Sequence, residues 1–408
     1  MNYNSILCRY CEIALKGKNR SMFEQKLVDN MKHVLRKIDN IKVSKTRGRL
    51  WIKKETPFNK QETEILHQQM PKLFGLASYS PGIMANPEIE SIKKAVLEIA
   101  QPIFESALNE KLNPSFRIRA RRADKSFPIK SKNLEILIAE LVGENFDKDE
   151  RLRVDLENAD ITVYCEVRET SSFVYLESFP GPGGLPTGSN SHVLSLLSGG
   201  IDSPVASSML MKRGCCVDFI TFHSYPYTPE ESVTKVKRLT QILNDFQPPR
   251  KLFICNLAEL QKLIRDNCSE KFRTILYRRY MFRIAEEIAK KNKNLALVTG
   301  EAVGQVASQT IVNLATIEEA IDMLVLRPLA GLDKEDVIKI AKEIDTFDIS
   351  IEQVPDSCTV FAPNAPATAA KVDKVIRDEK RLDVDQLLEQ IIEETWNSAV
   401  MITTDTNI

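Results

Sequence analysis

The chain has 408 residues, 43% of them hydrophobic and 27% charged, and its 56 Lys and Arg balance 56 Asp and Glu. This length suits two or three domains rather than one core, and the composition excludes a fibrous or disordered chain. The N-terminus lacks a basic start leading into a long apolar stretch, and no run of about 18 apolar residues occurs. The sequence therefore predicts a cytoplasmic protein that does not meet a membrane.

Charge is unevenly distributed along the chain. Residues 1–130 hold 25 Lys and Arg against 13 Asp and Glu, so the remainder is acidic overall. An asymmetry of this kind indicates that one end of the protein binds a polyanion, with a merely basic domain as the alternative.

The N-terminal segment, residues 1–76, is predicted to form a small α+β domain. A strand over residues 6–15 precedes a helix over residues 21–38, where apolar positions recur at helical spacing. Residues 41–54 read as two strands joined by the turn "TRGR". Basic side chains stand at the predicted loops, namely Lys16, Lys18, Arg20, Arg47 and Arg49.

The cysteines and histidines predict no metal centre. Eight cysteines are scattered without a repeated spacing, which argues against a disulfide framework in a cytoplasmic chain. Cys8 and Cys11 spell C-x-x-C, but residues three apart on the predicted strand point to opposite faces and suit a shared metal ion poorly. The four histidines are too dispersed to complete a zinc site.

A second unit, residues 77–178, contains a predicted helix over residues 88–108 and then "SFRIRARRADKSFP", where apolar residues alternate with arginines. Period-two alternation places Arg117, Arg119 and Arg121 on one strand face. These guanidiniums repel one another unless an anion such as a phosphate backbone lies over them, which favours RNA binding. The alternative interpretation is a solvated strand edge whose arginines pair with carboxylates such as Asp124. The RNA-binding candidates are Lys16, Lys18, Arg20, Arg117, Arg119, Arg121, Arg122 and Lys125.

The pattern changes after residues 179–192, which are rich in Gly, Pro and Ser and are predicted to be a linker. Through residues 193–370, short apolar runs alternate with helical segments. This alternation predicts an α/β domain with a parallel sheet that binds ligands at the carboxyl ends of its strands. Residues 371–408 are predicted as a C-terminal helix and tail.

The stretch "SLLSGGIDSP" lies between the first apolar run, residues 193–197, and a predicted helix in whose first turn Pro204 is tolerated. Backbone N–H groups of a glycine-containing turn, together with a helix N-terminus, suit an anion. The turn lacks the lysine of a Walker loop and the residue order of G-x-S-x-G, so we expect a different phosphate-binding loop. It consists of Ser198, Gly199, Gly200, Ile201, Asp202 and Ser203.

The S-G-G-x-D-S motif resembles that of PP-loop ATP pyrophosphatases, which transfer AMP to a carbonyl-type oxygen. Over roughly residues 1–370, further motifs occur in the order found in tRNA 4-thiouridine synthetases: "RYCEIALKGKNR", "RARRADKSFP", "GPGGLP", "FHSYPYT", "GQVASQT", "RPLAGLDKEDVIKIAKEI" and "DSCTVFAPNAPAT". The resemblance implies a ferredoxin-like N-terminal domain, a THUMP RNA-binding domain and a Rossmann-like PP-loop catalytic domain. It also implies the reaction, in which ATP adenylates C4–O of uridine 8 in tRNA and sulfur displaces AMP.

The same resemblance assigns individual residues. It implies that Asp202 orients the ATP phosphates and Mg²⁺, and that Cys358 carries a persulfide, which suits a nucleophilic thiolate. Further implied ATP contacts are Leu196, Leu197, Thr221, Phe222, Arg278, Gly300 and Gln309. We interpret the remaining cysteines of these domains as small core residues, namely Cys165, Cys215, Cys216, Cys255 and Cys268. The implied partners are tRNA, a cysteine desulfurase as sulfur donor and a second copy of the chain.

The sequence departs from the family pattern at three points. Cys11 stands where glycine is usual, and Asn364 stands where a lysine is common. Only 50 residues follow Cys358, too few for the rhodanese domain of longer relatives, which favours direct persulfide transfer from a desulfurase. The alternatives are another PP-loop tRNA-modifying enzyme and an RNA-binding module with an inactive nucleotide site. A role in making the thiazole of thiamine is less favoured.

Overall fold

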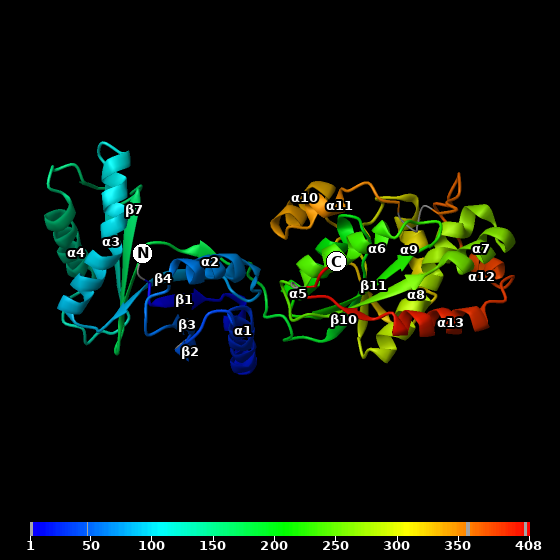
Figure 1. The fold of residues 1–408 in the computed structure, drawn as a ribbon, viewed down its shortest axis with the longest axis horizontal. Coiled ribbons are helices and arrows are strands. Elements are labelled where there is room, and N and C mark those ends of the chain that lie inside the picture. Colours follow the sequence, from blue (N-terminus) through cyan, green and yellow to red (C-terminus); the bar gives the residue numbers. More distant parts are fainter. Residues whose placement is uncertain (1–2, 47, 356–359, 404–405) are drawn as a thin grey trace. The chain divides into compact units, whose positions relative to one another are not determined.

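The computed structural model describes residues 3–46, 48–355, 360–403 and 406–408. Contacts within the chain divide it into two compact units, Met1–Gly184 and Leu185–Ile408. Each unit is built on its own β-sheet (Figure 1). Within the described ranges, no helix combines the length and the apolar composition needed to cross a membrane.

The first unit has one mixed sheet in the order β2-β3-β1-β4-β8-β7-β5-β6, with β9 paired to β4. Because β4 pairs with β1 on one side and β8 on the other, the two predicted N-terminal segments share this sheet. Its strands are β1 (Ser5–Arg9), β2 (Lys42–Thr46), β3 (Arg49–Lys53), β4 (Ser78–Ala85), β5 (Ser115–Arg122), β6 (Arg153–Val154), β7 (Ile161–Val167), β8 (Ser172–Tyr175) and β9 (Phe179–Pro180). Its helices are α1 (Arg20–Val34), α2 (Lys60–Gln69), α3 (Ile89–Glu110) and α4 (Ser131–Phe146).

The predicted strand over residues 6–15 is wrong beyond Arg9. The chain leaves the sheet there and forms a 3₁₀ helix over Glu12–Leu15, which buries Ile13 and leaves Leu15 exposed. Short apolar runs fit either conformation, because only tertiary contacts decide which side chain is buried. The opposite-face geometry expected for Cys8 and Cys11 therefore does not apply; Cys8 is buried and Cys11 is exposed.

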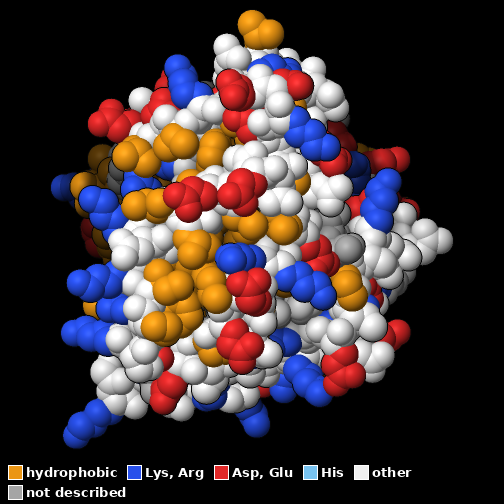
Figure 2. Space-filling view, turned by 90° about the vertical axis from the view of Figure 1, so that its left-hand side faces the viewer, with side chains coloured by type: hydrophobic (Ala, Val, Ile, Leu, Met, Phe, Trp, Pro, Cys, Tyr) orange, Lys and Arg blue, Asp and Glu red, His pale blue; other side chains and the backbone are white. Residues whose placement is uncertain are grey.

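Part of the first unit's surface is apolar. On the side that carries α3 and α4, hydrophobic side chains gather among charged ones (Figure 2). Between residues 89 and 160, the large hydrophobic residues that are exposed are Leu112, Ile136, Val154 and Leu156.

The second unit has a sheet in the order β14-β13-β10-β11-β12-β15, in which neighbouring strands are parallel except for β15. This confirms the predicted α/β domain. Its strands are β10 (His192–Leu196), β11 (Cys216–His223), β12 (Lys251–Asn256), β13 (Ala296–Val298), β14 (Leu324–Leu326) and β15 (Val400–Met401). Its helices are α5 (Asp202–Lys212), α6 (Glu231–Leu243), α7 (Ala258–Asn267), α8 (Arg273–Lys291), α9 (Ile311–Glu318), α10 (Lys334–Glu343), α11 (Phe347–Ser350), α12 (Val372–Glu379) and α13 (Asp385–Asn397).

Helices cover both faces of this sheet. α5 and α6 lie against β10 and β11, with α10 and α11 packed on them, whereas α8 lies against β10 and β13, with α7 and α13 beside it (Figure 1). The main core forms on the α8 side, where Leu194, Ile220 and Phe253 of the strands meet Tyr280 and Ile284 of the helix. The C-terminal segment, expected as a helix and tail, instead contributes two helices to this core and the edge strand β15.

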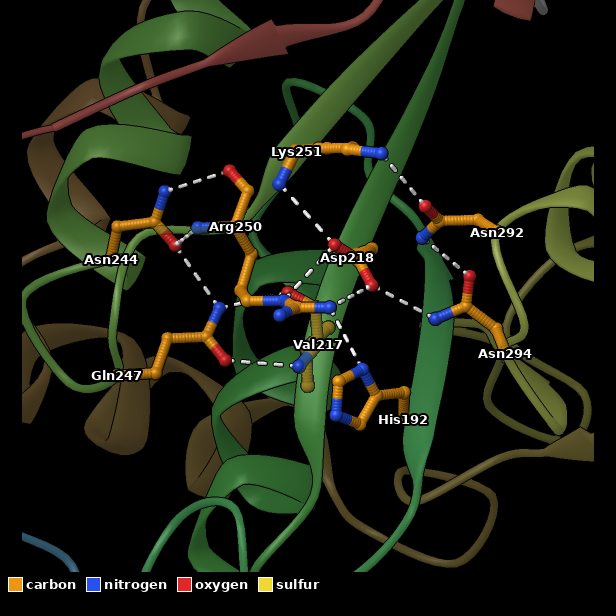
Figure 3. Close-up of polar contacts among 9 residues, drawn as sticks. All are labelled: His192, Val217, Asp218, Asn244, Gln247, Arg250, Lys251, Asn292 and Asn294. Carbon is orange, nitrogen blue, oxygen red and sulfur yellow. Dashed lines mark hydrogen bonds and ion pairs between the residues drawn. The ribbon is translucent and has the colours of Figure 1, made fainter.

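A buried polar network fixes the amino ends of the strands, opposite the predicted phosphate loop (Figure 3). The fully buried carboxylate of Asp218 accepts hydrogen bonds from Arg250 at 2.8 and 3.1 Å and from Asn294 at 2.9 Å. His192, at the start of β10, lies 2.8 Å from the Arg250 guanidinium. A buried carboxylate with this many donors is satisfied, so it holds neighbouring strand ends in register.

Candidate active site

The site lies where the order of the parallel strands reverses. β11 and β12 follow β10 on one side, whereas β13 and β14 lie on its other side. Connections that leave such a point in opposite directions open a crevice at the carboxyl ends of the strands, where α/β proteins bind ligands. The loop after β10, residues 197–201, and the residues after β13, Thr299 to Glu301, both lie at this edge.

Hydrogen bonds between its two serines close the predicted phosphate loop. The Ser203 hydroxyl accepts from the backbone N–H of Ser198 at 2.9 Å and lies 3.1 Å from the Ser198 hydroxyl. The Ser198 hydroxyl in turn accepts from the Gly200 N–H at 3.3 Å. These bonds curl the loop over the first turn of α5, whose N-terminus carries partial positive charge.

Glycine is needed in this loop for space and not for an unusual backbone conformation. Neither Gly199 nor Gly200 has a positive φ. A Cβ on Gly199 would lie 3.1 Å from Cδ of the buried Lys235, so glycine here lets a lysine of α6 pack under the loop. A Cβ on Gly200 would have only the Ser198 hydroxyl within 4 Å, which leaves that part of the loop open to an anion.

Asp202, the first residue of α5, is clamped by side chains from distant parts of the chain. Lys334 Nζ lies 2.5 Å from one carboxylate oxygen, and Gln305 Nε2 donates to the other at 3.0 Å. Lys334 begins α10 and was missed by sequence reasoning, although it lies within the quoted motif "RPLAGLDKEDVIKIAKEI". A fixed carboxylate paired with a lysine beside a phosphate loop suits binding of phosphates and their counter-ion.

A cavity of about 180 Å³ opens beside the loop and brings together most of the predicted ATP contacts. The predicted residues that line it are Leu196, Leu197, Ser198, Asp202, Ser203, Phe222, Arg278, Gly300 and Gln309. A second cavity, which shares Ser198 and Phe222, is lined by the remaining three, Gly199, Gly200 and Thr221. Residues from five separate segments thus converge on one edge of the sheet.

Glu301 anchors the arginine of the first cavity and was also missed from the sequence. Its buried carboxylate lies 2.5 Å from Arg278 and 2.8 Å from Arg327, and it accepts from the Thr299 hydroxyl at 3.0 Å. Arg278 also donates to Ser308 at 3.2 Å. The carboxylate therefore holds the guanidinium at the cavity wall, where a cation suits the ribose-phosphate part of a nucleotide.

Cys358 lies outside the described residues, so its role stays a prediction. All five cysteines that we interpreted as core residues are buried, which confirms that interpretation. They are Cys165, Cys215, Cys216, Cys255 and Cys268. Burial raises the pKa of Cys165 and Cys255 to about 12 and that of Cys268 to about 11. Thiols with such a pKa are protonated near neutral pH, whereas sulfur transfer needs a thiolate.

The predicted arginine strand is present as β5. Phe116 and Ile118 are buried and Arg119 and Arg121 are exposed, as the alternation predicts, whereas Arg117 and Ala120 are half-buried. Arg117 donates to the carbonyl oxygen of Glu157 at 2.8 Å, and Arg119 donates to that of Leu156 at the same distance. Because these acceptors are neutral, the bonds orient the guanidiniums without cancelling their charge.

Some of the other RNA-binding candidates are exposed, whereas others bond to carboxylates or a carbonyl group of the protein. Lys18 and Lys125 are exposed. Arg20 pairs with Glu24 at 2.9 Å, Lys16 lies 3.7 Å from Glu12, and Arg122 donates to the Phe127 carbonyl at 2.8 Å. The contacts of Arg20, Lys16 and Arg122 also hold their own loops in place.

A further basic cluster joins three arginines that are far apart in the sequence. Arg168 lies 3.1 Å from the buried carboxylate of Glu166, and Arg9 and Arg49 each lie 3.9 Å from it. One carboxylate cannot neutralise three guanidiniums, so the cluster is positive. Glu166 is also the register partner of Arg121, which places the β5 arginines beside the cluster.

Comparisons with known proteins agree with this geometry. Three family descriptions match the chain in order: "ThiI ferredoxin-like domain" over residues 5–80, "THUMP domain" over residues 86–177 and "Thiamine biosynthesis protein (ThiI)" over residues 188–384. A probable tRNA sulfurtransferase of Brevibacillus brevis is 39% identical, over 97% of this chain and 96% of the relative. The chain belongs to the ThiI family of tRNA sulfurtransferases.

Other members of the ThiI family match over similar lengths. A probable tRNA sulfurtransferase of Thermoanaerobacter pseudethanolicus is 39% identical over 95% of this chain and 99% of its own. A solved 4-thiouridine synthetase, in complex with RNA and bound ATP, has a TM-score of 0.87 at 35% identity, over 98% of this chain and 100% of the other. These matches confirm the expected ferredoxin-like, THUMP and PP-loop domains.

The close approach of Gly300 to α5 yields a prediction. A Cβ on Gly300 would lie 2.6 Å from the backbone nitrogen of Ser203, so Gly300→Ala must displace the loop or the helix start. Overpacking of this kind costs about 1–3 kcal/mol, and we expect the Kd for ATP to rise at least tenfold, as measured by calorimetry. The matched control is Gly331→Ala, because a Cβ there meets nothing within 4 Å. Equal ATP affinity in the two variants would contradict this assignment of the cavity.

Proposed function

We propose that this protein uses ATP to replace O4 of a tRNA uridine with sulfur, giving 4-thiouridine. The observation that carries the proposal is the phosphate loop at the reversal of strand order, with Asp202 held beside it by Lys334. Support comes from the 35% identity, over 98% of the chain, to the 4-thiouridine synthetase solved with RNA and ATP.

The first step activates a poor leaving group. The uridine O4 attacks the α-phosphorus of ATP, the bond from that phosphorus to the bridging oxygen breaks, and its electron pair leaves with pyrophosphate, while the N3 proton passes to solvent. The backbone N–H groups of the loop and the N-terminus of α5 stabilise the charge that develops on pyrophosphate. Lys334, 2.5 Å from Asp202, adds a positive charge at the same place.

Mg²⁺ is a proposed cofactor of this step. It is usually held by one or two carboxylates together with substrate phosphates and retains several waters. Asp202 fits this pattern, since it is a single carboxylate at the end of the phosphate loop with both oxygens oriented by neighbours. When bound, Mg²⁺ would neutralise charge on the ATP phosphates.

In the second step the sulfur comes from a persulfide on Cys358. Its terminal sulfur attacks C4, the C4–O bond breaks, and AMP leaves with the electron pair. The sulfur then bridges C4 and Cys358 until another thiol attacks the Cys358 sulfur, forms a disulfide with it and releases 4-thiouridine. A cysteine desulfurase as persulfide donor, a homodimer and a cytoplasmic location complete the proposal; the family resemblance supports the first two.

Reconstitution tests the reaction and both named residues. Unmodified tRNA incubated with the protein, Mg-ATP, cysteine and a cysteine desulfurase should yield 4-thiouridine, detected by mass spectrometry of the digested nucleosides. Cys358→Ala should abolish the product, whereas Cys11→Ala, which removes an exposed cysteine of the first unit, should not change it. Asp202→Ala should slow the reaction at least about 100-fold, because it removes a preorganised charge beside the phosphates.

The contrary outcomes point to specific alternatives. Thiolation without Cys358 would move the persulfide to another cysteine. If the intact protein made a different modified nucleoside, it would be another PP-loop tRNA-modifying enzyme. If it bound tRNA without any ATP-dependent pyrophosphate release, the nucleotide site would be inactive.

We also propose that the basic residues of the first unit bind tRNA phosphates. The double variant Arg119→Ala/Arg121→Ala should weaken tRNA binding and make the slope of log K against log salt shallower by about 1–2, because fewer counter-ions are released. ATP affinity should not change. The control Lys262→Ala removes a partly exposed cation that pairs with Glu259 in the second unit and should leave the slope as it is. An unchanged slope in the double variant would show that Arg119 and Arg121 do not contact tRNA phosphates.

A further inference from the structure

Lys235 of α6 is the one lysine among the described residues that is buried, with 6% of its surface exposed. Lysine is almost never fully buried unless partners satisfy its amine, because an unpaired amine in the interior costs free energy. The two steps of the proposed reaction do not use this side chain. The groups that it contacts therefore indicate its role.

The amine of Lys235 binds the chain that leads to Cys358. Nζ donates to the carbonyl oxygens of Ser350 at 3.0 Å and of Glu352 at 2.8 Å, which lie 115 and 117 residues further along the chain. Ser350 ends α11, and the last carbonyl groups of a helix lack partners within it, so a lysine suits them. These bonds hold residues 350–352 against α6, and Cys358 follows shortly in the sequence.

The methylene chain of the same lysine lies under the predicted phosphate loop. A Cβ on Gly199 would lie 3.1 Å from Cδ of Lys235, 3.5 Å from Cε and 3.6 Å from Nζ. The loop itself is closed by the bonds between Ser198 and Ser203. One side chain therefore contacts both the phosphate loop and the segment before Cys358.

The chain is also anchored after Cys358. Phe361 packs its ring edge to face on Tyr227, with 5.0 Å between ring centroids, and the Arg265 guanidinium lies 4.6 Å over the Phe361 ring. Both kinds of contact are favourable. Phe361 has a positive φ of 55°, a conformation that is costly for a residue with a side chain and that its contacts must offset. Residues on both sides of Cys358 are thus tied to the body of the second unit.

We propose that Lys235 is a positioning residue for sulfur transfer, which fixes the chain before Cys358 relative to the phosphate loop, while Phe361 anchors the chain after it. The reaction has two steps at one uridine, so the sulfur must reach C4 at the place where ATP has activated O4. Holding reacting groups in this way accelerates a step, and a displacement of about 1 Å can cost about 100-fold in rate. This inference rests on the proposed function and assigns residues to its second step alone.

Separate measurement of the two steps tests the proposal. Lys235→Met keeps an unbranched apolar chain under the loop but removes the donor to residues 350–352. In a single turnover with unmodified tRNA, Mg-ATP and protein loaded with persulfide by a cysteine desulfurase, we expect 4-thiouridine to form at least about tenfold more slowly. Pyrophosphate release and the Kd for ATP should stay within about twofold of the parent, because the first step does not need the cysteine.

Leu243→Ala is the control for a general loss of stability. Leu243 is fully buried near the other end of α6, and its truncation leaves a cavity without changing Lys235. We expect a lower midpoint of thermal unfolding and parent rates for both steps. If Leu243→Ala slowed 4-thiouridine formation as selectively as Lys235→Met, the effect would be one of stability and the proposal would be overturned.

Phe361→Ala gives a second test, which stands even if Lys235→Met fails to fold. Phe361 is half-buried, and its removal should slow 4-thiouridine formation while leaving pyrophosphate release unchanged. Thiolation at the parent rate in Phe361→Ala, or in folded Lys235→Met, would overturn the proposal. Loss of ATP binding in folded Lys235→Met would assign the lysine to the phosphate loop instead. No thiolation by the intact protein would overturn the proposed function.

Discussion

The chain leaves β10 through α5 and leaves β13 through α9, and these helices lie on opposite faces of the sheet, so a crevice opens between the carboxyl ends of β10 and β13. The site depends on this constraint. It places the loop of Ser198 and Gly200 beside Gly300, and it leaves a Cβ no room at Gly300 because the start of α5 lies against it. The phosphate loop, the helix dipole beneath it and the wall of the first cavity all follow from one reversal of strand order.

At their amino ends, the same strands are held together by hydrogen bonds between polar side chains. Arg250 binds the buried carboxylate of Asp218 and contacts His192 there (Figure 3). Such a network is costly to break, since removing one partner leaves a buried charge at a cost of about 3–5 kcal/mol. A comparable pair joins α8 to the C-terminal segment, where buried Arg279 binds Glu379 at 3.0 Å. Rigid strand ends and a fixed α8 keep the carboxyl edge preorganised for ATP.

The features predicted correctly from the sequence are those that depend on residues close together in the chain. The strand, turn and helix around Ser198 depend on neighbouring residues, and the alternation of β5 depends on period two alone, so both were predictable. Lys334 was not, because its partner Asp202 is 132 residues away and only the fold brings them together. The cluster around Glu166 was missed for the same reason, since Arg9, Arg49 and Arg168 come from distant segments of the chain. The strand expected to reach residue 15 failed because tertiary burial of Ile13 selected a 3₁₀ helix.

The central claim is that ATP activates the uridine oxygen, and the fate of that oxygen tests it most directly. A tRNA synthesised with ¹⁸O at O4 of the target uridine would be thiolated to completion, and the AMP product would be analysed by mass spectrometry. We expect the ¹⁸O to appear in the phosphate of AMP, because the C4–O bond breaks after O4 has bonded to the α-phosphorus. AMP without the label, with ¹⁸O released to water, would contradict it.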